Sequence, residues 1–232
     1  MNPTEYKELL ESVLERGFFF KSFEEFTVKD NCQVILRHDV DFSVDMAVQM
    51  AALEKDLGVF STFYFLLASD SYNLLSKKNS DSLKLIIDMG HSVGLHFDPI
   101  VHDDEKSGFN NELEVFERNF GNTASMSFHR PSQLVLDGVN WLPKRILGAY
   151  QDEFFKDIAY ISDSQGEFRY GHPLEHEAFE LRRNMQLLIH PIWWMTDKSQ
   201  AVEKVQNFLN LNNDLMSDHI ARNCLPWKKF NE

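Results

Sequence analysis

The sequence predicts an α/β fold built on a mainly parallel β-sheet. Segments rich in β-branched and aromatic residues alternate with segments of helical periodicity along most of its 232 residues. Such alternation is typical of βαβ units, in which consecutive strands run parallel. Several predicted strands end in a histidine or a carboxylate, as in folds that gather their functional groups at the carboxyl ends of the strands. The first strand runs into RHDVD rather than a glycine-rich turn, so the fingerprint of a dinucleotide-binding fold is absent.

The first predicted element is an N-terminal helix. Asn2 is a suitable N-cap, Pro3 suits the first helical position, and Glu5 could complete a capping box. An apolar stripe follows at helical spacing, and Gly17 ends it.

Six apolar or β-rich segments are predicted as strands. Their boundaries are residues 33–38, 60–67, 91–97, 124–128, 159–162 and 185–189. Helices are predicted between strands: one capped by Ser43 and ended by Gly58, one ended by Gly90, and one that includes Phe116. A last helix opens at Ser199, and its predicted core face is Val202, Val205, Phe208 and Leu209. Periodicity alone does not distinguish an open sheet from a closed barrel.

The composition predicts one domain over residues 1–232. The chain is 43% hydrophobic and contains 20 Phe, which is enough for a well-developed core. No internal repeat, low-complexity tract or linker interrupts it. We expect residues 33–195 to carry the functional motifs and the N- and C-terminal helices to pack on that core.

The charge and hydropathy of the chain exclude several classes of partner. A formal net charge of −13 without a clear Lys/Arg cluster disfavours nucleic acid and broad electrostatic binding to anionic membranes. Small anionic substrates are still possible, because a metal ion can reverse the local field. No apolar run approaches the roughly 20 residues of a membrane-spanning helix, and the first residues lack the apolar segment of a signal peptide. We therefore expect a cytoplasmic protein with no membrane insertion, in which Cys32 and Cys224 are reduced.

Two aspartates after the first strand are the strongest candidates for chemistry. Asp39 and Asp41 would point to the same face if the strand persists through them, together with Arg37. Two adjacent carboxylates repel each other unless a cation lies between them. A divalent metal would use one Asp as ligand and leave the other as base. Capping of the next helix is the alternative role, but Ser43 fills it better.

The next strand ends at His96, with Asp98 on the same face. Imidazole is a common ligand of zinc, so His96 is a candidate ligand and Asp98 a candidate ligand or substrate-binding residue. His91 begins that strand and should lie at its other end, in a structural role. His172 and His176 have the spacing of a helical metal pair, but Pro173 predicts a solvated loop there.

Two later strands also end in polar residues. His129 and Arg130 follow the strand at 124–128, and an arginine there can hold a catalytic carboxylate in its ionised form. His190 ends the last strand; a histidine with a pKa near ~6.5 is suited to protonating a leaving amine. Trp193 and Trp194 follow, and could offer apolar faces to a sugar ring or simply be buried.

The order of these motifs resembles that of the polysaccharide deacetylases, also called the NodB homology group or carbohydrate esterase family 4. The matching segments are RHDVD, GHSVGLHFDP, SFHRPS, YISDS and LLIHP, spread over residues 33–195. RHDVDFS and HPIWW are similar to a branch associated with lipopolysaccharide, O-antigen and other surface-polysaccharide biosynthesis.

The resemblance implies an irregular seven-stranded (β/α) barrel and a metal-dependent hydrolase, most commonly with zinc. Asp41 would be a metal ligand with two histidines, and Asp39 the base. Arg130 would orient Asp39, His190 would protonate the leaving amine, and Asp163 would tune His190. The implied reaction removes an N-acetyl group from an amino sugar carried on a nucleotide- or lipid-linked precursor.

The sequence departs from the family pattern at two positions. Val40 separates the aspartates, which are adjacent in the family, so the base and ligand roles could be exchanged. Ile100 stands where the family has its second ligand histidine. We expect His129 to supply the missing ligand, with His102 and Asp98 as alternatives. Cleavage of another C–N bond, such as a formamide or cyclic amide, and a metal-free carbohydrate-binding relative are the competing functions.

Overall fold

The computed structural model describes residues 1–230, apart from the side chains of Leu134 and Lys229. Its centre is one sheet in which every strand pair is parallel. The strands are β1 (Phe19–Phe20), β2 (Gln33–Val40), β3 (Thr62–Leu66), β4 (Ser92–Phe97), β5 (Ser125–Phe128), β6 (Leu147–Gly148), β7 (Ala159–Ser162) and β8 (Met185–Ile189). Seven of them follow the order β6-β5-β4-β3-β2-β8-β7, and β1 pairs with the start of β2. The predicted α/β fold with a seven-strand parallel sheet is confirmed.

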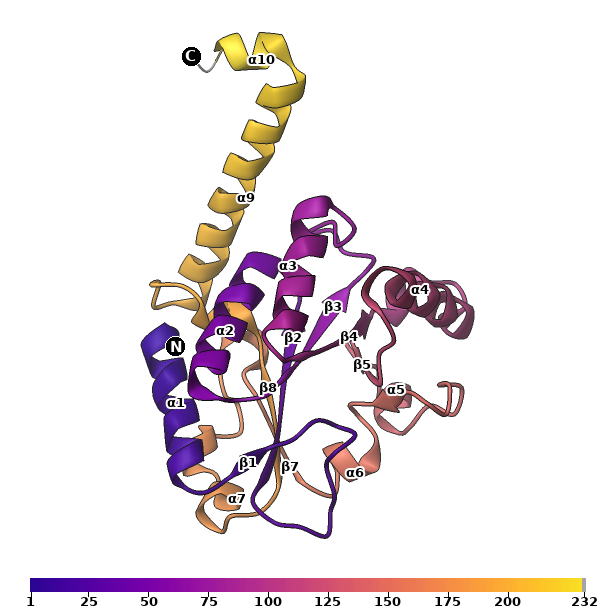
Figure 1. The fold of residues 1–232 in the computed structure, drawn as a ribbon, viewed down its shortest axis with the longest axis vertical. Helices are drawn as coiled ribbons and strands as arrows, with labels where there is room; N and C mark the ends of the chain where they lie inside the picture. Colours follow the sequence, from indigo (N-terminus) through magenta and orange to yellow (C-terminus); the bar gives the residue numbers. More distant parts are fainter. Residues whose placement is uncertain (231–232) are drawn as a thin grey trace.

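Helices cover the outer face of this sheet (Figure 1). The longer ones are α1 (Pro3–Glu15), α2 (Val44–Leu57), α3 (Lys77–Asp88), α4 (Glu105–Phe120) and α9 (Ala201–Asn223). The short ones are α5 (Gln133–Leu136), α6 (Asp152–Phe155), α7 (Glu177–Glu180), α8 (Pro191–Trp194) and α10 (Leu225–Phe230), with 3-10 turns at Pro99–Val101, Ser164–Gly166 and Pro173–Glu175. Among the described residues, none of the helices has both the length and the apolar character that crossing a membrane requires.

The predicted caps set the ends of the first helices. Asn2 Oδ1 accepts from the Glu5 backbone N–H at 3.0 Å, and Ser43 Oγ accepts from the Met46 N–H at 3.3 Å. Gly58 ends α2 with a φ of 69°, a conformation that favours glycine. The entry of the chain into α2, directly after Asp39 and Asp41, is thus set by local sequence.

The two faces of β2 have different environments, although all its residues are buried. Val34, Leu36 and Val40 pack in the main apolar core with residues of α1 and α2. Arg37 and Asp39 alternate with them and so face the inside of the sheet. The inner face therefore places the buried charges of Arg37 and Asp39 inside the curve of the sheet.

Side chains close the gap between the two edge strands. β6 and β7 do not pair with each other among residues 1–230. Instead, Gln186 of β8 donates its amide to the carbonyls of Ala149, at 3.2 Å, and Phe154, at 2.5 Å. The rings of Tyr150 and Tyr160 lie 6.2 Å apart across the same gap. The barrel is therefore irregular, with one seam made by side chains instead of backbone hydrogen bonds.

Two expectations for the last helix need correction. This helix was expected to open at Ser199, but its N-cap is Gln200. Val202 and Leu209 were expected on its core face, but both side chains are exposed. Only Lys204 and Phe208 of α9 are buried, because most of this helix projects from the body (Figure 1). His172 and His176, for which a solvated loop was predicted, each cap a short turn: Nδ1 of His172 accepts from the Leu174 N–H and Nδ1 of His176 from the Ala178 N–H.

Candidate metal and catalytic site

A cavity of about 340 Å³ opens at the carboxyl ends of the strands. β2 continues through Val40, so Asp39 lies within the strand and Asp41 directly after it. The residues lining the cavity are Asp39, Asp41, Phe42, His96, Phe128, His129, Arg130, Pro131, Tyr150, Ser164, Gln165, Leu188, His190 and Trp193. Most of the predicted site residues, which are far apart in sequence, thus meet in one cavity.

Asp41, His96 and His129 form a cluster that could hold a metal ion. One ligand atom from each lies within 4.8 Å of the others. Asp41 Oδ1 is 3.2 Å from His96 Nε2 and 3.4 Å from His129 Nδ1. One carboxylate with two imidazoles is a donor set typical of zinc and related divalent metals.

The polar atoms of this cluster fit a cation. Asp41 Oδ1 is buried and has no hydrogen-bond partner among the described residues, because the contacts with both imidazoles lack hydrogen-bond geometry. His96 Nδ1 lies 3.3 Å from the Ser127 carbonyl, which can only accept, so this nitrogen carries the proton. Nε2 of His96 is then free to bind a metal. A hydrogen bond at the far nitrogen is usual for histidine ligands of metals.

The charges of the cluster act on one another. Burial alone would raise the pKa of Asp41, but the imidazoles of His129, His96 and His190 outweigh burial and hold that pKa well below its usual range. Burial would likewise lower the pKa of His96, yet the carboxylates of Asp39 and Asp41 raise it. Positive charge is therefore favoured at this point of the cavity.

Asp39 is held by one of its two carboxylate oxygens. Its Oδ2 accepts from Arg37 Nη2 at 3.3 Å and from Ser127 Oγ at 3.1 Å. Its Oδ1 is buried and has no hydrogen-bond partner among residues 1–230. The carboxylate is thus fixed in orientation while one oxygen stays available to accept a proton.

His190 is held by Asp163 on the other side of the cavity. His190 Nδ1 lies 2.6 Å from Asp163 Oδ1, and the His190 backbone N–H donates to both carboxylate oxygens at 3.1 Å. Trp194 Nε1 donates to Asp163 Oδ2 at 2.7 Å. Burial lowers the pKa of His190, but the charge and hydrogen bond of Asp163 exceed this effect and raise it to about 9. The metal-free histidine is therefore protonated at neutral pH.

The structure corrects the expected partner of Arg130. Its guanidinium pairs with Asp98 instead of Asp39. Arg37, which is fully buried, takes the expected position beside Asp39 and also donates to Tyr150 Oη at 2.8 Å. The reason is the strand geometry: Arg37 and Asp39 are two residues apart on one strand and share its inner face.

Asp98 and Trp194 are also displaced from their expected role in binding substrate. Asp98 accepts from the Ile100 N–H at 3.2 Å besides pairing with Arg130, and it does not line the cavity. Trp194 is 1% exposed and donates a hydrogen bond to Asp163, whereas Trp193 lines the cavity. Of the two tryptophans, only Trp193 therefore remains a candidate for contact with a substrate in the cavity.

The remaining histidines lie elsewhere. His102 Nε2 is 2.6 Å from Glu112 Oε1, and the His102 ring stacks on Phe97. Neither His102 nor Asp98, the two alternatives for the third ligand, belongs to the cluster of Asp41, His96 and His129. His91 Nε2 faces the Ala51 carbonyl at 3.0 Å, in the structural position expected of it.

Two contacts of the site were not predicted from the sequence, those of Ser127 and Tyr150. Arg37 was expected on the same strand face as Asp39, but Arg130 was expected to be the partner of that carboxylate. Ser127 could have been found, since it lies two residues before His129 on the same strand face. Tyr150 carries no such signal, because it follows the two-residue strand β6.

Comparison with known proteins gives fold likeness only. No family model matches the chain, and no curated protein matches it. Among solved structures, a family 4 carbohydrate esterase from Bacillus anthracis is similar at 14% identity and a TM-score of 0.45, covering 89% of this chain and 86% of its own. The Streptococcus pyogenes deacetylase PplD, solved with acetate, is similar at 13% identity and a TM-score of 0.48, covering 83% and 85%. The wild-type BA3943 protein of Bacillus anthracis, a CE4 family pseudoenzyme, is similar at 14% identity and a TM-score of 0.45, covering 83% and 66%.

Proposed function

We propose that this protein is a divalent-metal-dependent hydrolase that removes the N-acetyl group of an amino sugar. The observation that carries the proposal is the convergence of Asp41, His96 and His129 within 4.8 Å, beside a carboxylate with one unpartnered oxygen. Metal-dependent amide hydrolysis requires a cation site, a base and an acid that reach one cavity. Zinc fits the one-carboxylate, two-imidazole donor set.

Asp41, His96 and His129 would hold the metal. A divalent cation bound there would lower the pKa of water and polarise the amide carbonyl of the substrate. The proton transfers of the reaction are assigned to side chains of the protein itself.

Asp39 is the proposed base. Arg37 and Ser127 fix its Oδ2, so Oδ1 accepts the proton of the attacking water as the new C–O bond forms at the acyl carbon.

His190 is the proposed acid. It donates a proton to the amine nitrogen as the C–N bond breaks, so that acetate and a free amine leave the site. Asp163 holds His190 through Nδ1, which directs Nε2 toward the side of Asp41, at 3.9 Å from its Oδ2. Trp193 would contact the sugar ring at the wall of the cavity.

The proposed substrate is an amino sugar on a nucleotide- or lipid-linked precursor of a surface polysaccharide, handled in the cytoplasm. This part depends on the likeness of RHDVDFS and HPIWW to the surface-polysaccharide branch. A formamide or cyclic amide would need the same metal, base and acid.

Acetate release tests the proposal. Purified protein, its metal content measured by elemental analysis, is offered acetamido, formamido and cyclic amide sugars, and the released acid and amine are quantified. We expect acetate, a loss of about 10²–10⁴-fold in rate for Asp39→Asn, and no loss for Asp56→Asn on the exposed surface of α2. Sugar binding without turnover, and without dependence on metal, would instead support a carbohydrate-binding protein.

A further inference from the structure

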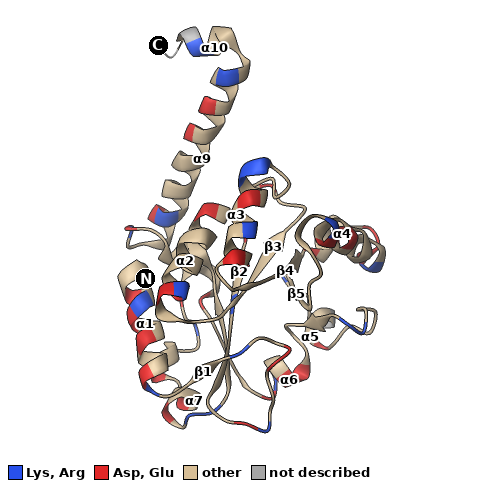
Figure 2. Cartoon of the chain, viewed as in Figure 1, with Lys and Arg blue, Asp and Glu red and all other residues tan. Residues whose placement is uncertain are grey.

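A buried glutamate, Glu54, lies on the outer side of β2 and does not line the cavity. Figure 2 shows charged residues mainly on the helices and loops around the sheet, and Glu54 belongs to one of these helices, α2. Its side chain is nevertheless 0% exposed. Burying an ionised carboxylate costs free energy unless other groups pair with it, and an apolar residue would avoid this cost. The partners of Glu54 therefore indicate what the carboxylate does.

Four side chains surround the carboxylate of Glu54. The Tyr6 hydroxyl donates to Oε1, and Ser61 Oγ donates to Oε2 at 2.5 Å. His38 Nε2 lies 2.8 Å from Oε1, within ion-pair distance although outside hydrogen-bond geometry, and His91 Nδ1 lies 3.6 Å from Oε2. Burial alone would raise the pKa of Glu54, but His38, His91 and Ser61 lower this pKa, so the carboxylate is ionised at neutral pH.

One of these partners connects Glu54 to the end of β8. His38 Nδ1 lies 3.0 Å from the Ile189 carbonyl, which can only accept, so this nitrogen donates. Ile189 is the last residue of β8 and directly precedes His190, while His38 directly precedes Asp39. The pair of Glu54 and His38 thus holds together two strand ends whose next residues are the proposed base and the proposed acid.

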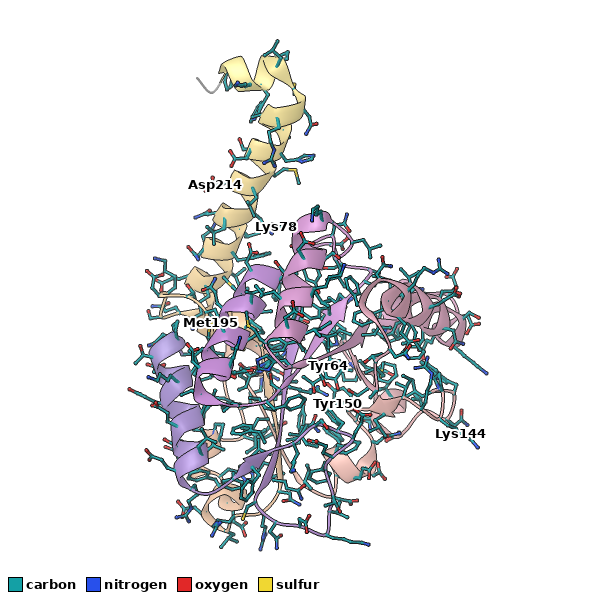
Figure 3. All side chains as sticks on the ribbon, viewed as in Figure 1. Tyr64, Lys78, Lys144, Tyr150, Met195 and Asp214 are labelled. Carbon is teal, nitrogen blue, oxygen red and sulfur yellow. The ribbon has the colours of Figure 1, made fainter. Side chains whose placement is uncertain are left out.

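A second partner connects the buried carboxylate to Asp163. The ring of Tyr6 packs against the ring of Trp194, with 5.4 Å between the centroids. Trp194 Nε1 donates to Asp163 Oδ2 at 2.7 Å, and Asp163 holds His190 through Nδ1. α8, which carries Trp194, contacts α1 and α2, and Figure 3 shows Met195, the residue after α8, beside α2. Two separate routes therefore lead from one carboxylate to one histidine.

We propose that Glu54 is a positioning residue, which holds His190 in the orientation that proton donation in the cavity requires. The inference rests on the proposed function, in which His190 is the acid. Loss of the Glu54 charge removes the partner that holds His38 on the Ile189 carbonyl and weakens the acceptor of the Tyr6 hydroxyl. Both routes to His190 then lose their support at the same time.

Glu112 offers a matched control. It is 7% exposed, and its Oε1 lies 2.6 Å from His102 Nε2, so it is also a buried glutamate next to a histidine. Neither Glu112 nor His102 lines the cavity. Glu54→Gln and Glu112→Gln both keep the shape of the side chain and weaken its pair with a histidine, so both should lower the thermal midpoint. A role in stability alone would make the two variants alike in every other measurement.

Proton NMR of the full chain tests the proposal without any activity measurement. The proton that His190 Nδ1 shares with Asp163 and the indole N–H of Trp194 both report the geometry around the histidine. His190→Gln and Trp194→Phe assign the two resonances. We expect Glu54→Gln to shift both resonances and to speed solvent exchange of the indole proton, and Glu112→Gln to leave them as in the wild type. If Glu54→Gln does not fold, Tyr6→Phe replaces it, because this variant keeps the ring against Trp194 and removes only the bond to Glu54.

Acetate release gives the second measurement. Misplacing a catalytic group by about 1 Å can cost about 10²-fold in rate, so kcat of Glu54→Gln should fall by about 10- to 100-fold with KM unchanged. Glu112→Gln should keep both constants.

Resonances shifted in Glu54→Gln alone, together with the loss in kcat, support the proposal. Three results overturn it: resonances that are alike in the two glutamate variants, a retained kcat in Glu54→Gln, or a change in KM alone. If the wild-type protein releases no acetate, the proposed function fails, while shifted resonances would still show that Glu54 sets the geometry of His190. The two failures are therefore seen separately.

Discussion

Nη2 of Arg37 lies 3.3 Å from Oδ2 of Asp39, two residues along the same buried strand. Both side chains are almost completely buried, and Arg37 Nε and Nη1 have no hydrogen-bond partner among the described residues. Arg37 also lies over the ring of Tyr150, 4.6 Å from its centroid. A buried cation with so few partners depends on its carboxylate, and Asp39 in turn depends on Arg37.

This pair predicts a contrast between two arginines. Arg37→Met should destabilise the protein by about 3–5 kcal/mol, the usual cost of removing one partner of a buried ion pair. Arg130→Met should cost no more than about 1 kcal/mol, because the Arg130 side chain is 56% exposed. Urea unfolding measures both. Equal costs would contradict the assignment of Arg37 to Asp39.

The ligand cluster predicts which substitutions weaken metal binding. Loss of a residue that hydrogen-bonds to a metal-binding side chain lowers metal affinity by roughly 10- to 100-fold. His96→Gln and Asp41→Asn remove a metal-binding side chain itself, so each should lower zinc affinity by more than that. His102→Gln should leave affinity unchanged, since His102 pairs with Glu112 outside the cluster. Calorimetric titration of chelator-treated protein checks this. Strong binding by the His96 variant would mean that the metal is held elsewhere.

Metal binding should also raise thermal stability. A ligand at about 100 times its Kd adds about 2.7 kcal/mol to a protein that binds it only when folded. Zinc should therefore raise the Tm of the wild-type protein and not that of Asp41→Asn. An equal rise in both would point to adventitious binding on the surface.

The raised pKa of His190 predicts how stability changes with pH in the metal-free protein. The folded pKa is about 9, against 6.5 for an ordinary histidine. Because the folded state holds this proton more tightly, the stabilisation is complete below pH ~6.5 and is lost as pH rises towards ~9. The Tm in the presence of a chelator should fall across that window, and less so in His190→Gln. His219→Gln, on the projecting part of α9, serves as control and should follow the wild type.

Gly94 is predicted to be required by close packing inside the sheet. A Cβ at this position would lie 2.5 Å from the Ser125 carbonyl oxygen and 2.6 Å from the Tyr64 ring. Gly94→Ala should cost about 1–3 kcal/mol, the usual penalty of overpacking. In Gly148→Ala the nearest atom is a Leu142 methyl at 3.1 Å, which is on a flexible side chain, so the cost should be smaller. Denaturant unfolding of the two variants compares them.

Much of the fold could be predicted because its signals are local. Periodicity gave the alternation of strands and helices, and β7 and β8 have the predicted boundaries. Asn2 and Ser43 are the N-caps of α1 and α2, as predicted. The segment between β5 and β7 was not predicted, since β6 has only two residues and α5 and α6 four each, too short for a periodic signal.

The sequence by itself determined which residue types stand at the strand ends, because side-chain alternation and capping act within a few residues. Tertiary structure decided which of them meet. The register of β4 with β5 pairs His96 with Ser127, so His129 comes two residues further on the same face and lies near Asp41. The partner of Arg130 could not be predicted for the same reason, because Asp98 lies 32 residues away in the sequence. Contacts between distant strands depend on how the whole sheet is paired and curved, which no local pattern specifies.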